Sequence, residues 1–270
     1  MKELSGRVAV VTGAGSGIGR ATAVALANRG CSLALVDVND EALDATQQTI
    51  ESGGAKASVH VADVSSSERM AELPDEVMER HGACHVLVNN AGVLTVGRFA
   101  DEELDESRWV IGINVYGMLY GCHHFLPVLL EQDEAHIVNV SSMAAFAGIP
   151  QNAVYSLTKG AVRSFTEALR SELIGTNVGV SALFPGGVDT NIMHTSRGAQ
   201  SAQLSALAKR KFVRYLGSSP EGAGRKIVQA IDHNKARVLL GPDARALDIT
   251  ARILPGRTAL LGRVLDRITR

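Results

Sequence analysis

Two side chains four residues apart have the chemistry of an acid–base pair. Tyr155 and Lys159 fall within a predicted helix, Asn152–Ile174, and their spacing puts both on one face of it. Free tyrosine, with a pKa of about 10, is a poor base at neutral pH. A cation about 4 Å away is worth roughly 4 kcal/mol at an effective dielectric constant near 20, which corresponds to about three pKa units. The pair therefore predicts a Tyr155 hydroxyl that exchanges protons near neutral pH.

Two adjacent hydroxyl groups could assist that proton transfer. Ser141 and Ser142 follow the apolar run Ala135–Val140, which we expect to form a buried strand. A serine hydroxyl can hydrogen-bond a substrate oxygen and stabilise the charge that develops on it. Because neighbouring residues of a strand point to opposite faces, only one of the two can do so. The residue pattern alone leaves the choice open.

A glycine-rich segment near the N-terminus has the composition of a phosphate-binding turn. The segment Thr12–Gly19 lies between a predicted strand, Arg7–Val11, and a predicted helix, Ile18–Arg29. Glycines let the backbone approach a pyrophosphate, and the free N–H groups at a helix start attract an anion. A turn without a ligand is the alternative, and the position between strand and helix favours the phosphate site. The candidate contacts are Gly13, Ser16, Gly17, Ile18 and Gly19.

An acidic residue ends the second predicted strand, Ser32–Val36. A carboxylate at Asp37, about twenty residues after the loop, can accept hydrogen bonds from the adenosine ribose of NAD. It would also repel the 2′-phosphate of NADP, and neither Ser16 nor Val38 is basic. The sequence therefore predicts NAD rather than NADP, against the alternative of a solvated carboxylate at a strand end.

The elements that position these residues alternate along the chain. Short apolar runs alternate with longer amphipathic stretches, which is typical of βαβ units around a parallel sheet. The remaining predicted strands are Lys56–Val61, His85–Val88, Val178–Phe184 and Arg237–Leu240, and the remaining helices are about Asp40–Glu51, Ser65–His81, Glu106–Leu130 and Pro220–Asn234. We expect Pro74 to interrupt the helix after Ser65. The pattern predicts an α/β fold with a doubly wound, seven-stranded parallel sheet.

The domain organisation follows from the same pattern. Residues 1–241 are predicted to form one domain, with residues 190–217 as its substrate-facing segment. Residues 242–270 depart from the strand–helix alternation and form a basic, amphipathic tail. Such a tail can lie on a membrane surface, but packing on the core or on a partner subunit is favoured.

Composition excludes several classes of protein. A net charge of −1 and a pI near 6.7 give no basic patch for nucleic acid. Three cysteines are an odd number at wide spacing, which predicts neither a disulfide framework nor a zinc site. His123 and His124 point about 100° apart on a helix, and no third ligand lies nearby, so no metal site is expected.

One apolar stretch is long enough to cross a membrane. Residues Trp109–Leu130 carry no Lys, Arg, Asp or Glu. The stretch contains Asn114, Pro127 and three glycines, however, so a buried helix or subunit interface fits better. The N-terminus lacks the long apolar stretch of a signal peptide. A cytoplasmic protein is expected.

Several motifs in order resemble those of the short-chain dehydrogenase/reductase family, from about Gly6 to Thr190. Thr12–Gly19 is similar to the family's TGxxxGxG, Asn89–Gly92 to its NNAG and Pro185–Thr190 to its PGxVxT. Asp63–Val64 matches the pair that meets the adenine, and Asn114, Ser142, Tyr155 and Lys159 fall at the catalytic positions. Two departures are Thr158, where the family has a serine, and Leu157, where a small residue is common.

The resemblance implies a Rossmann-type fold and a role for each matched residue. It selects Ser142 over Ser141. It implies that Lys159 binds the cofactor ribose in addition to acting on Tyr155, and that Asn114 takes part in a water-mediated proton relay. Further implied cofactor contacts are Asn90, Ala91, Gly92, Pro185, Gly186, Val188 and Thr190. The substrate is expected to meet Ser142, Ala144, Gln151 and Tyr155, with Leu94 and Met143 beside them.

The expected activity is hydride transfer between NAD(H) and a small, largely apolar alcohol or ketone. Secondary alcohols, sterols, retinoids and diketones remain open as substrates. An NADPH-dependent ketoacyl-type reductase is one alternative, and a catalytically idle NAD-binding scaffold is another. The resemblance also implies a homo-tetramer or homo-dimer, in which the helix after Trp109 and the Tyr155 helix meet their counterparts.

Overall fold

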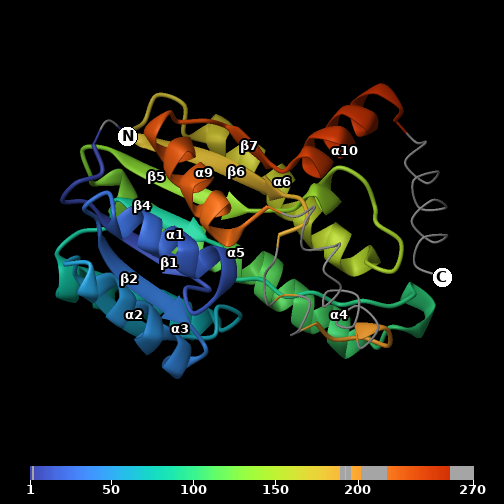
Figure 1. Cartoon of the computed structure of the whole chain (residues 1–270), viewed down its shortest axis with the longest axis horizontal. Helices are drawn as coiled ribbons and strands as arrows, with labels where there is room; N and C mark the ends of the chain where they lie inside the picture. The colour runs from blue at the N-terminus through green and yellow to red at the C-terminus, as the bar shows by residue number, and fades with distance from the viewer. Residues whose placement is uncertain (2, 189–191, 193–195, 202–217, 256–270) are drawn as a thin grey trace.

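The computed structural model describes residues 1, 3–188, 192, 196–201 and 218–255 of the 270. In this part of the chain, seven parallel strands form one sheet in the order β3-β2-β1-β4-β5-β6-β7. Their bounds are Val8–Thr12 (β1), Ser32–Asp37 (β2), Ala57–Val61 (β3), Val86–Asn89 (β4), Ala135–Val140 (β5), Val178–Pro185 (β6) and Arg237–Leu240 (β7). The chain winds outward in both directions from β1 and β4 (Figure 1), which confirms the predicted doubly wound, Rossmann-type fold.

Helices cover both faces of this sheet. One face carries α1 (Gly17–Ala27), α2 (Asp40–Ser52) and α9 (Pro220–Asp232), and the other carries α3 (Ser67–His81), α5 (Gly117–Leu130) and α6 (Ala153–Glu172). Every residue of β1, β4 and β5 is buried, as expected for parallel strands covered on both sides. Helices α1 and α9 pack tightly, since a Cβ on Gly224 would lie 2.6 Å from the carbonyl oxygen of Ala21.

The predicted long helix before β5 contains a wider turn. It begins as α4 (Leu104–Ile111), passes through a π-helical turn at Gly112–Tyr116 and continues as α5. Asn114 lies inside this turn and is buried. Such single π turns occur often at functional sites. The described part of the chain contains no helix long and apolar enough to cross a membrane.

The predicted interruption at Pro74 is wrong. Helix α3 runs through this proline, which is buried. An internal proline costs a helix about 3 kcal/mol, because it removes one hydrogen bond and crowds the preceding turn. Part of this cost is offset locally: the Ser66 hydroxyl caps the first turn by accepting from the N–H of Arg69, and the ion pair between Arg69 and Glu76 spans the proline.

The first part of the predicted tail is an ordered helix. Helix α10 (Pro242–Ile253) begins directly after β7. Its buried Asp248 accepts hydrogen bonds from Arg237 at 2.9 Å and from Arg252 at 3.1 Å. Residues 256–270 lie outside the described residues, so membrane contact by the tail stays a prediction.

Candidate active site

A cavity of about 850 Å³ opens at the carboxyl ends of the strands. This edge of a doubly wound sheet is where ligands bind, at the point where the strand order reverses between β1 and β4. The lining includes most of the predicted cofactor contacts and three of the four predicted catalytic residues: Gly13, Ser16, Gly17, Ile18, Asp37, Asp63, Val64, Asn90, Ala91, Gly92, Ser142, Tyr155, Lys159, Pro185, Gly186 and Val188. Gly19 and Asn114 lie behind this lining, and Thr190 lies outside the described residues.

The glycine-rich loop leaves a cradle at the start of α1. A Cβ on Gly19 would lie 2.0 Å from the carbonyl oxygen of Gly13 and 2.6 Å from the side-chain amide nitrogen of Asn90, so only glycine fits there. Ser16 makes no side-chain cap of α1, and the first turn holds no acidic residue. The first N–H groups of the helix therefore have no side-chain acceptor from the cap. The cradle and the helix start fit the pyrophosphate of a dinucleotide.

Asp37 lies beside the cradle at the end of β2. Its carboxylate accepts a hydrogen bond from the N–H of Gly15 at 2.9 Å and another from the N–H of Asn39 at 3.1 Å. The same side chain lines the cavity. Asp37 thus ties the glycine-rich loop to the second strand while it faces the space where a ribose would lie.

One basic residue of the cavity wall was missed by the sequence analysis. Arg20 follows the cradle on α1. Its guanidinium donates to the hydroxyl of Thr46 at 3.0 Å and to the carbonyl oxygens of Gly15 and Ala42. These contacts brace the loop from behind and use donors that a phosphate would otherwise take.

Asp63 and Val64 follow β3, the strand that pairs with β2, and line the cavity on the same side as Asp37. Asp63 accepts hydrogen bonds from the N–H and the hydroxyl of Ser65, at 2.9 and 2.7 Å. A Cβ on Gly117 would lie 2.6 Å from the Val64 side chain, so α5 approaches this loop closely. These contacts fix both residues in the cavity lining, and their contact with adenine stays a prediction.

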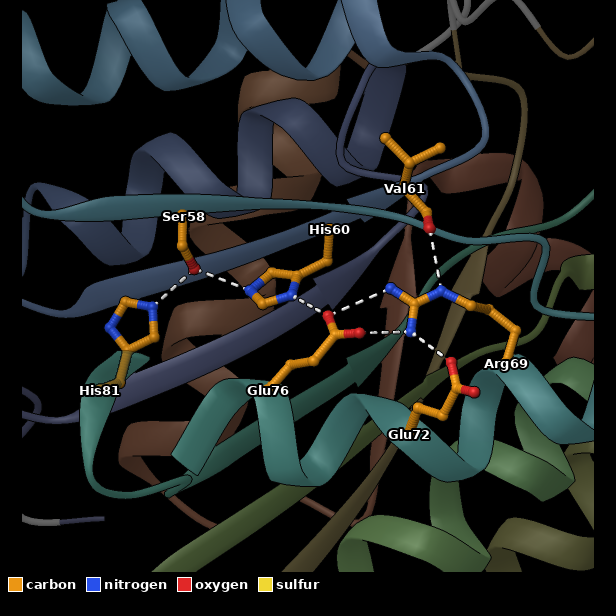
Figure 2. A network of polar contacts seen from close by, with 7 residues as sticks. All are labelled: Ser58, His60, Val61, Arg69, Glu72, Glu76 and His81. Atoms are coloured by element: carbon orange, nitrogen blue, oxygen red, sulfur yellow. Dashed lines mark hydrogen bonds and ion pairs between the residues drawn. The ribbon is translucent and has the colours of Figure 1, made fainter. Parts of the chain in front are cut away.

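Two histidines on and beside β3 share one serine (Figure 2). The Ser58 hydroxyl lies 2.8 Å from Nε2 of His60 and 2.7 Å from Nε2 of His81. Burial lowers the pKa of His60 and lowers that of His81 to about 4. Both rings are therefore neutral at neutral pH.

The same network continues to α3 through an acid and a base. Nδ1 of His60 lies 2.8 Å from the Glu76 carboxylate, and Arg69 donates to that carboxylate at 3.1 Å. The Arg69 guanidinium holds the pKa of Glu76 at about 2. Arg69 also donates to the carbonyl oxygen of Val61 at 3.1 Å. The network fixes α3 to the end of β3, two residues before Asp63, and the sequence analysis did not anticipate it.

Tyr155 and Lys159 share one face of α6, as predicted. Lys159 is buried and Tyr155 is partly buried, and Nζ of Lys159 lies 5.8 Å from the centre of the Tyr155 ring. The ammonium also donates to the carbonyl oxygen of Val140 at 3.1 Å. The end of β5 and the start of α6 therefore meet at this pair.

The predicted lowering of the Tyr155 pKa is wrong. Burial raises the pKa of Tyr155, and a hydrogen bond with Ser142 opposes this rise. Burial also lowers the pKa of Lys159 to about 8. The sequence argument counted the attraction between cation and phenolate but left out the desolvation of both groups, which penalises each charged form.

The two adjacent serines point in different directions. The Ser141 hydroxyl donates to the carbonyl oxygen of Lys159 at 2.8 Å. The Ser142 hydroxyl accepts from the N–H of Ala144 at 3.2 Å and is within hydrogen-bonding reach of Tyr155. The structure thus brings Ser142 together with Tyr155.

Asn114 clamps the loop behind the pair. Its amide accepts from the N–H of Val93 at 2.8 Å and donates to the carbonyl oxygen of Val93 at 2.9 Å. It also donates to the hydroxyl of Thr158 at 3.1 Å. A Cβ on Gly92 would lie 3.2 Å from both the Asn114 oxygen and Nζ of Lys159, so these two groups converge over Gly92. The water-mediated relay through Asn114 stays a prediction.

The substrate side of the cavity is mostly apolar. Leu94 and Met143 line it as predicted, together with Val93, Ile113, Ile149, Asn152 and Ile192, which the sequence analysis did not name. Ala144 and Gln151 are absent from the lining. Ala144 is buried behind Ser142, and Gln151, with φ of 64°, uses its carbonyl oxygen to accept from the N–H of Gly97. Their contact with substrate stays a prediction.

Two short bridges lie within or beside the segment 190–217, which was predicted to face the substrate. Val188 pairs with Ser218, and Thr95 pairs with Arg197. The Arg197 guanidinium lies 3.9 Å from the centre of the Trp109 ring, so it is engaged with α4 rather than free as a solvated helix face. Among the described residues, no cluster of His, Cys, Asp or Glu could hold a metal ion.

Comparisons with known proteins agree with this geometry. Residues 7–201 match the sequence model of a family described as short chain dehydrogenase. The chain is 35% identical over 256 residues to the oxidoreductase SadH of Mycobacterium tuberculosis, covering 94% of this chain and 93% of that protein. The chain therefore belongs to the short-chain dehydrogenase/reductase family, a family of oxidoreductases.

Two solved structures have the same fold. A short-chain dehydrogenase/reductase from Burkholderia phymatum, in complex with NAD, is 33% identical with a TM-score of 0.87, covering 97% of each chain. The apo form of LigD from Sphingobium sp. strain SYK-6 is 26% identical with a TM-score of 0.80, covering 93% of this chain and 96% of LigD.

Proposed function

We propose that the protein is an NAD-dependent oxidoreductase that acts on a small, largely apolar alcohol or ketone, with Tyr155 as acid and base. The observation that carries this proposal is the meeting of Ser142, Tyr155 and Lys159 in the cavity that also holds the glycine cradle. A cavity that joins a dinucleotide cradle to an acid–base pair has the parts required for hydride and proton transfer to one substrate.

The residues divide the reaction between them. Bound NAD would supply the hydride acceptor. The Ser142 hydroxyl hydrogen-bonds the substrate oxygen, and Tyr155 takes the proton from that oxygen during oxidation. In the opposite direction the protonated Tyr155 donates to the carbonyl oxygen, a role suited by its raised pKa. Lys159, with a pKa of about 8, stays mostly protonated at neutral pH and places a positive charge beside Tyr155.

The part of the cavity proposed to hold the adenosine favours NAD over NADP as the cofactor. Asp37 lines the cavity as a carboxylate and would repel a 2′-phosphate. The guanidinium of Arg20 is bound to Thr46 and to backbone oxygens, so it offers little compensation. Val38, 64% exposed at the mouth of the cavity, carries no charge. The NADPH-dependent ketoacyl-type reductase is the weaker proposal for these reasons.

The apolar wall supports an uncharged substrate. Leu94, Met143 and Ile149 supply hydrophobic contact, and Asn152 adds a polar group to this side. Among the described lining residues of this side there is no arginine or lysine that would clamp a carboxylate or phosphate. Size and apolar surface, rather than an ion pair, then select the substrate.

We also propose a homo-dimer or homo-tetramer built on α5 and α6. Tyr116, next to α5, is 50% exposed, Leu130 of α5 is 43% exposed and Leu157 of α6 is 58% exposed. These helices carry the stretch after Trp109 and the Tyr155 face that were predicted to meet their counterparts.

The three cysteines are buried free thiols, which supports a reducing compartment such as the cytoplasm.

The experiment is turnover of NAD, followed by NADH absorbance, against a panel of secondary alcohols and ketones. We expect turnover with NAD that is lost in Tyr155→Phe while NADH binding, followed by fluorescence, remains. Binding of NADH without turnover of any compound would favour the idle scaffold. Absence of binding of either nucleotide would refute the proposal.

A further inference from the structure

The loop after β6 is held from outside by the start of α10. Gly186 and Gly187 line the cavity near the catalytic residues. The N–H of Gly186 donates to the carbonyl oxygen of Leu240 at 2.9 Å, and the N–H of Gly187 donates to the Asp243 carboxylate at 2.6 Å. Asp243 belongs to the segment that the sequence analysis set apart as a tail.

The Asp243 carboxylate fits into a space that two glycines leave open. A Cβ on Gly186 would lie 2.1 Å from one carboxylate oxygen, and a Cβ on Gly241 would lie 2.3 Å from the same oxygen. That oxygen also accepts from the N–H of Ala244 at 2.9 Å, which fixes the carboxylate within the first turn of its own helix. The anion therefore sits in one place, with one oxygen directed to α10 and the other to the loop.

The other side of the loop is held as well. The carbonyl oxygen of Gly187 accepts from the N–H of Ser218 at 2.8 Å. Both peptide groups that meet at Gly187 are thus engaged outside the cavity. Rotating either peptide plane breaks one of these hydrogen bonds, and the bond to the Asp243 carboxylate is stronger than one between neutral groups.

We infer that Asp243 is a positioning residue that fixes the loop Gly186–Val188 against the cofactor. This inference rests on the proposed function, since it assigns the loop to the NAD site. Asp243 does not line the cavity and acts through the N–H of Gly187. The start of α10 thereby becomes part of the cofactor site rather than a separate tail.

The test compares three variants of the full chain in steady-state turnover with NAD. Asp243→Ala removes the acceptor of the Gly187 N–H. Because a hydrogen bond to a charged group is lost, KM for NAD should rise about tenfold or more. KM for the alcohol should change less. Asp243→Asn keeps an oxygen acceptor and should recover most of that loss. Asp248→Asn is the matched control, because it breaks ion pairs of α10 without touching the loop.

A second readout needs no cofactor. Hydrogen–deuterium exchange of the ligand-free chain should show faster exchange at Gly187 in Asp243→Ala and unchanged exchange there in Asp248→Asn. An unchanged KM for NAD in Asp243→Ala, or a larger rise in Asp248→Asn, would overturn the inference while the proposed function stood. Failure of the unaltered chain to bind nucleotide would sink both, and exchange at Gly187 would then report only whether Asp243 holds the loop.

Discussion

Replacing Asp37 with asparagine should shift cofactor preference while the glycine-rich loop stays in place. In the structure one carboxylate oxygen accepts from the N–H of Gly15 and the other from the N–H of Asn39. The amide oxygen of asparagine can keep the bond to Gly15, so the loop remains tied to β2. What disappears is the negative charge that faces the cavity.

The size of the shift follows from two contributions. A charged hydrogen bond to a ribose hydroxyl is worth about 1.5–3 kcal/mol, so kcat/KM for NAD should fall roughly tenfold to 150-fold. A carboxylate repels each unit charge of a phosphate about 5 Å away by roughly 3 kcal/mol at an effective dielectric constant near 20. Removing that repulsion should favour NADP by about a hundredfold. The ratio of the two cofactor efficiencies should therefore move by roughly a thousandfold.

The assay is the initial rate of reduction of NAD and of NADP by the unaltered chain and by Asp37→Asn. Asp40→Asn serves as the control, because that carboxylate begins α2 without lining the cavity. Adding Val38→Arg should strengthen the preference for NADP, since this exposed position lies at the mouth. A ratio that moves less than about tenfold would refute the electrostatic argument, because the charge term alone predicts about a hundredfold.

Three further predictions concern stability, measured by urea unfolding of the ligand-free chain. Because burial lowers the Lys159 pKa to about 8, this side chain binds fewer protons in the folded chain than in the unfolded chain between about pH 8 and pH 10.5. Over that range the stability of the unaltered chain should rise relative to that of Lys159→Met, which keeps every other titrating group. Glu76→Gln should destabilise the chain by about 1–3 kcal/mol at neutral pH, with the difference from the unaltered chain shrinking as pH falls from about 4.5 towards 2, where the Glu76 carboxylate becomes protonated. Gly19→Ala should cost about 1–3 kcal/mol, since its Cβ meets backbone. Equal stability of the variant and unaltered chains would contradict each of the last two.

Much of the fold could be predicted from local patterns. The bounds of β5 and β7 match the predicted strands, because each is a short apolar run between polar turns. The glycine cradle beside the cavity was also predicted, since its residues are contiguous and lie between a strand and a helix. These features depend on neighbours in sequence.

The features that were missed depend on contacts between distant residues. The π turn at Asn114 coincides with hydrogen bonds to Val93 and Thr158, which hydrophobic periodicity cannot register. The pKa of Tyr155 is raised rather than lowered, because the spacing of residues in the sequence does not show how far a side chain is buried. Asp243 looked like part of a tail because its partner, Gly187, lies 56 residues earlier.

The bridge between Val188 and Ser218 has a consequence for how the protein could evolve. After β6 the chain passes through Val188, and it comes back beside this residue at Ser218. The two ends of the intervening stretch are therefore held together. With both ends fixed in this way, the entropic cost of closure grows slowly with the number of residues between them, by about 0.6 kcal/mol for each doubling of that number. Under the proposed function, in which residues 190–217 face the substrate, insertions or deletions in this stretch change the range of compounds accepted and leave the nucleotide-binding half unaltered.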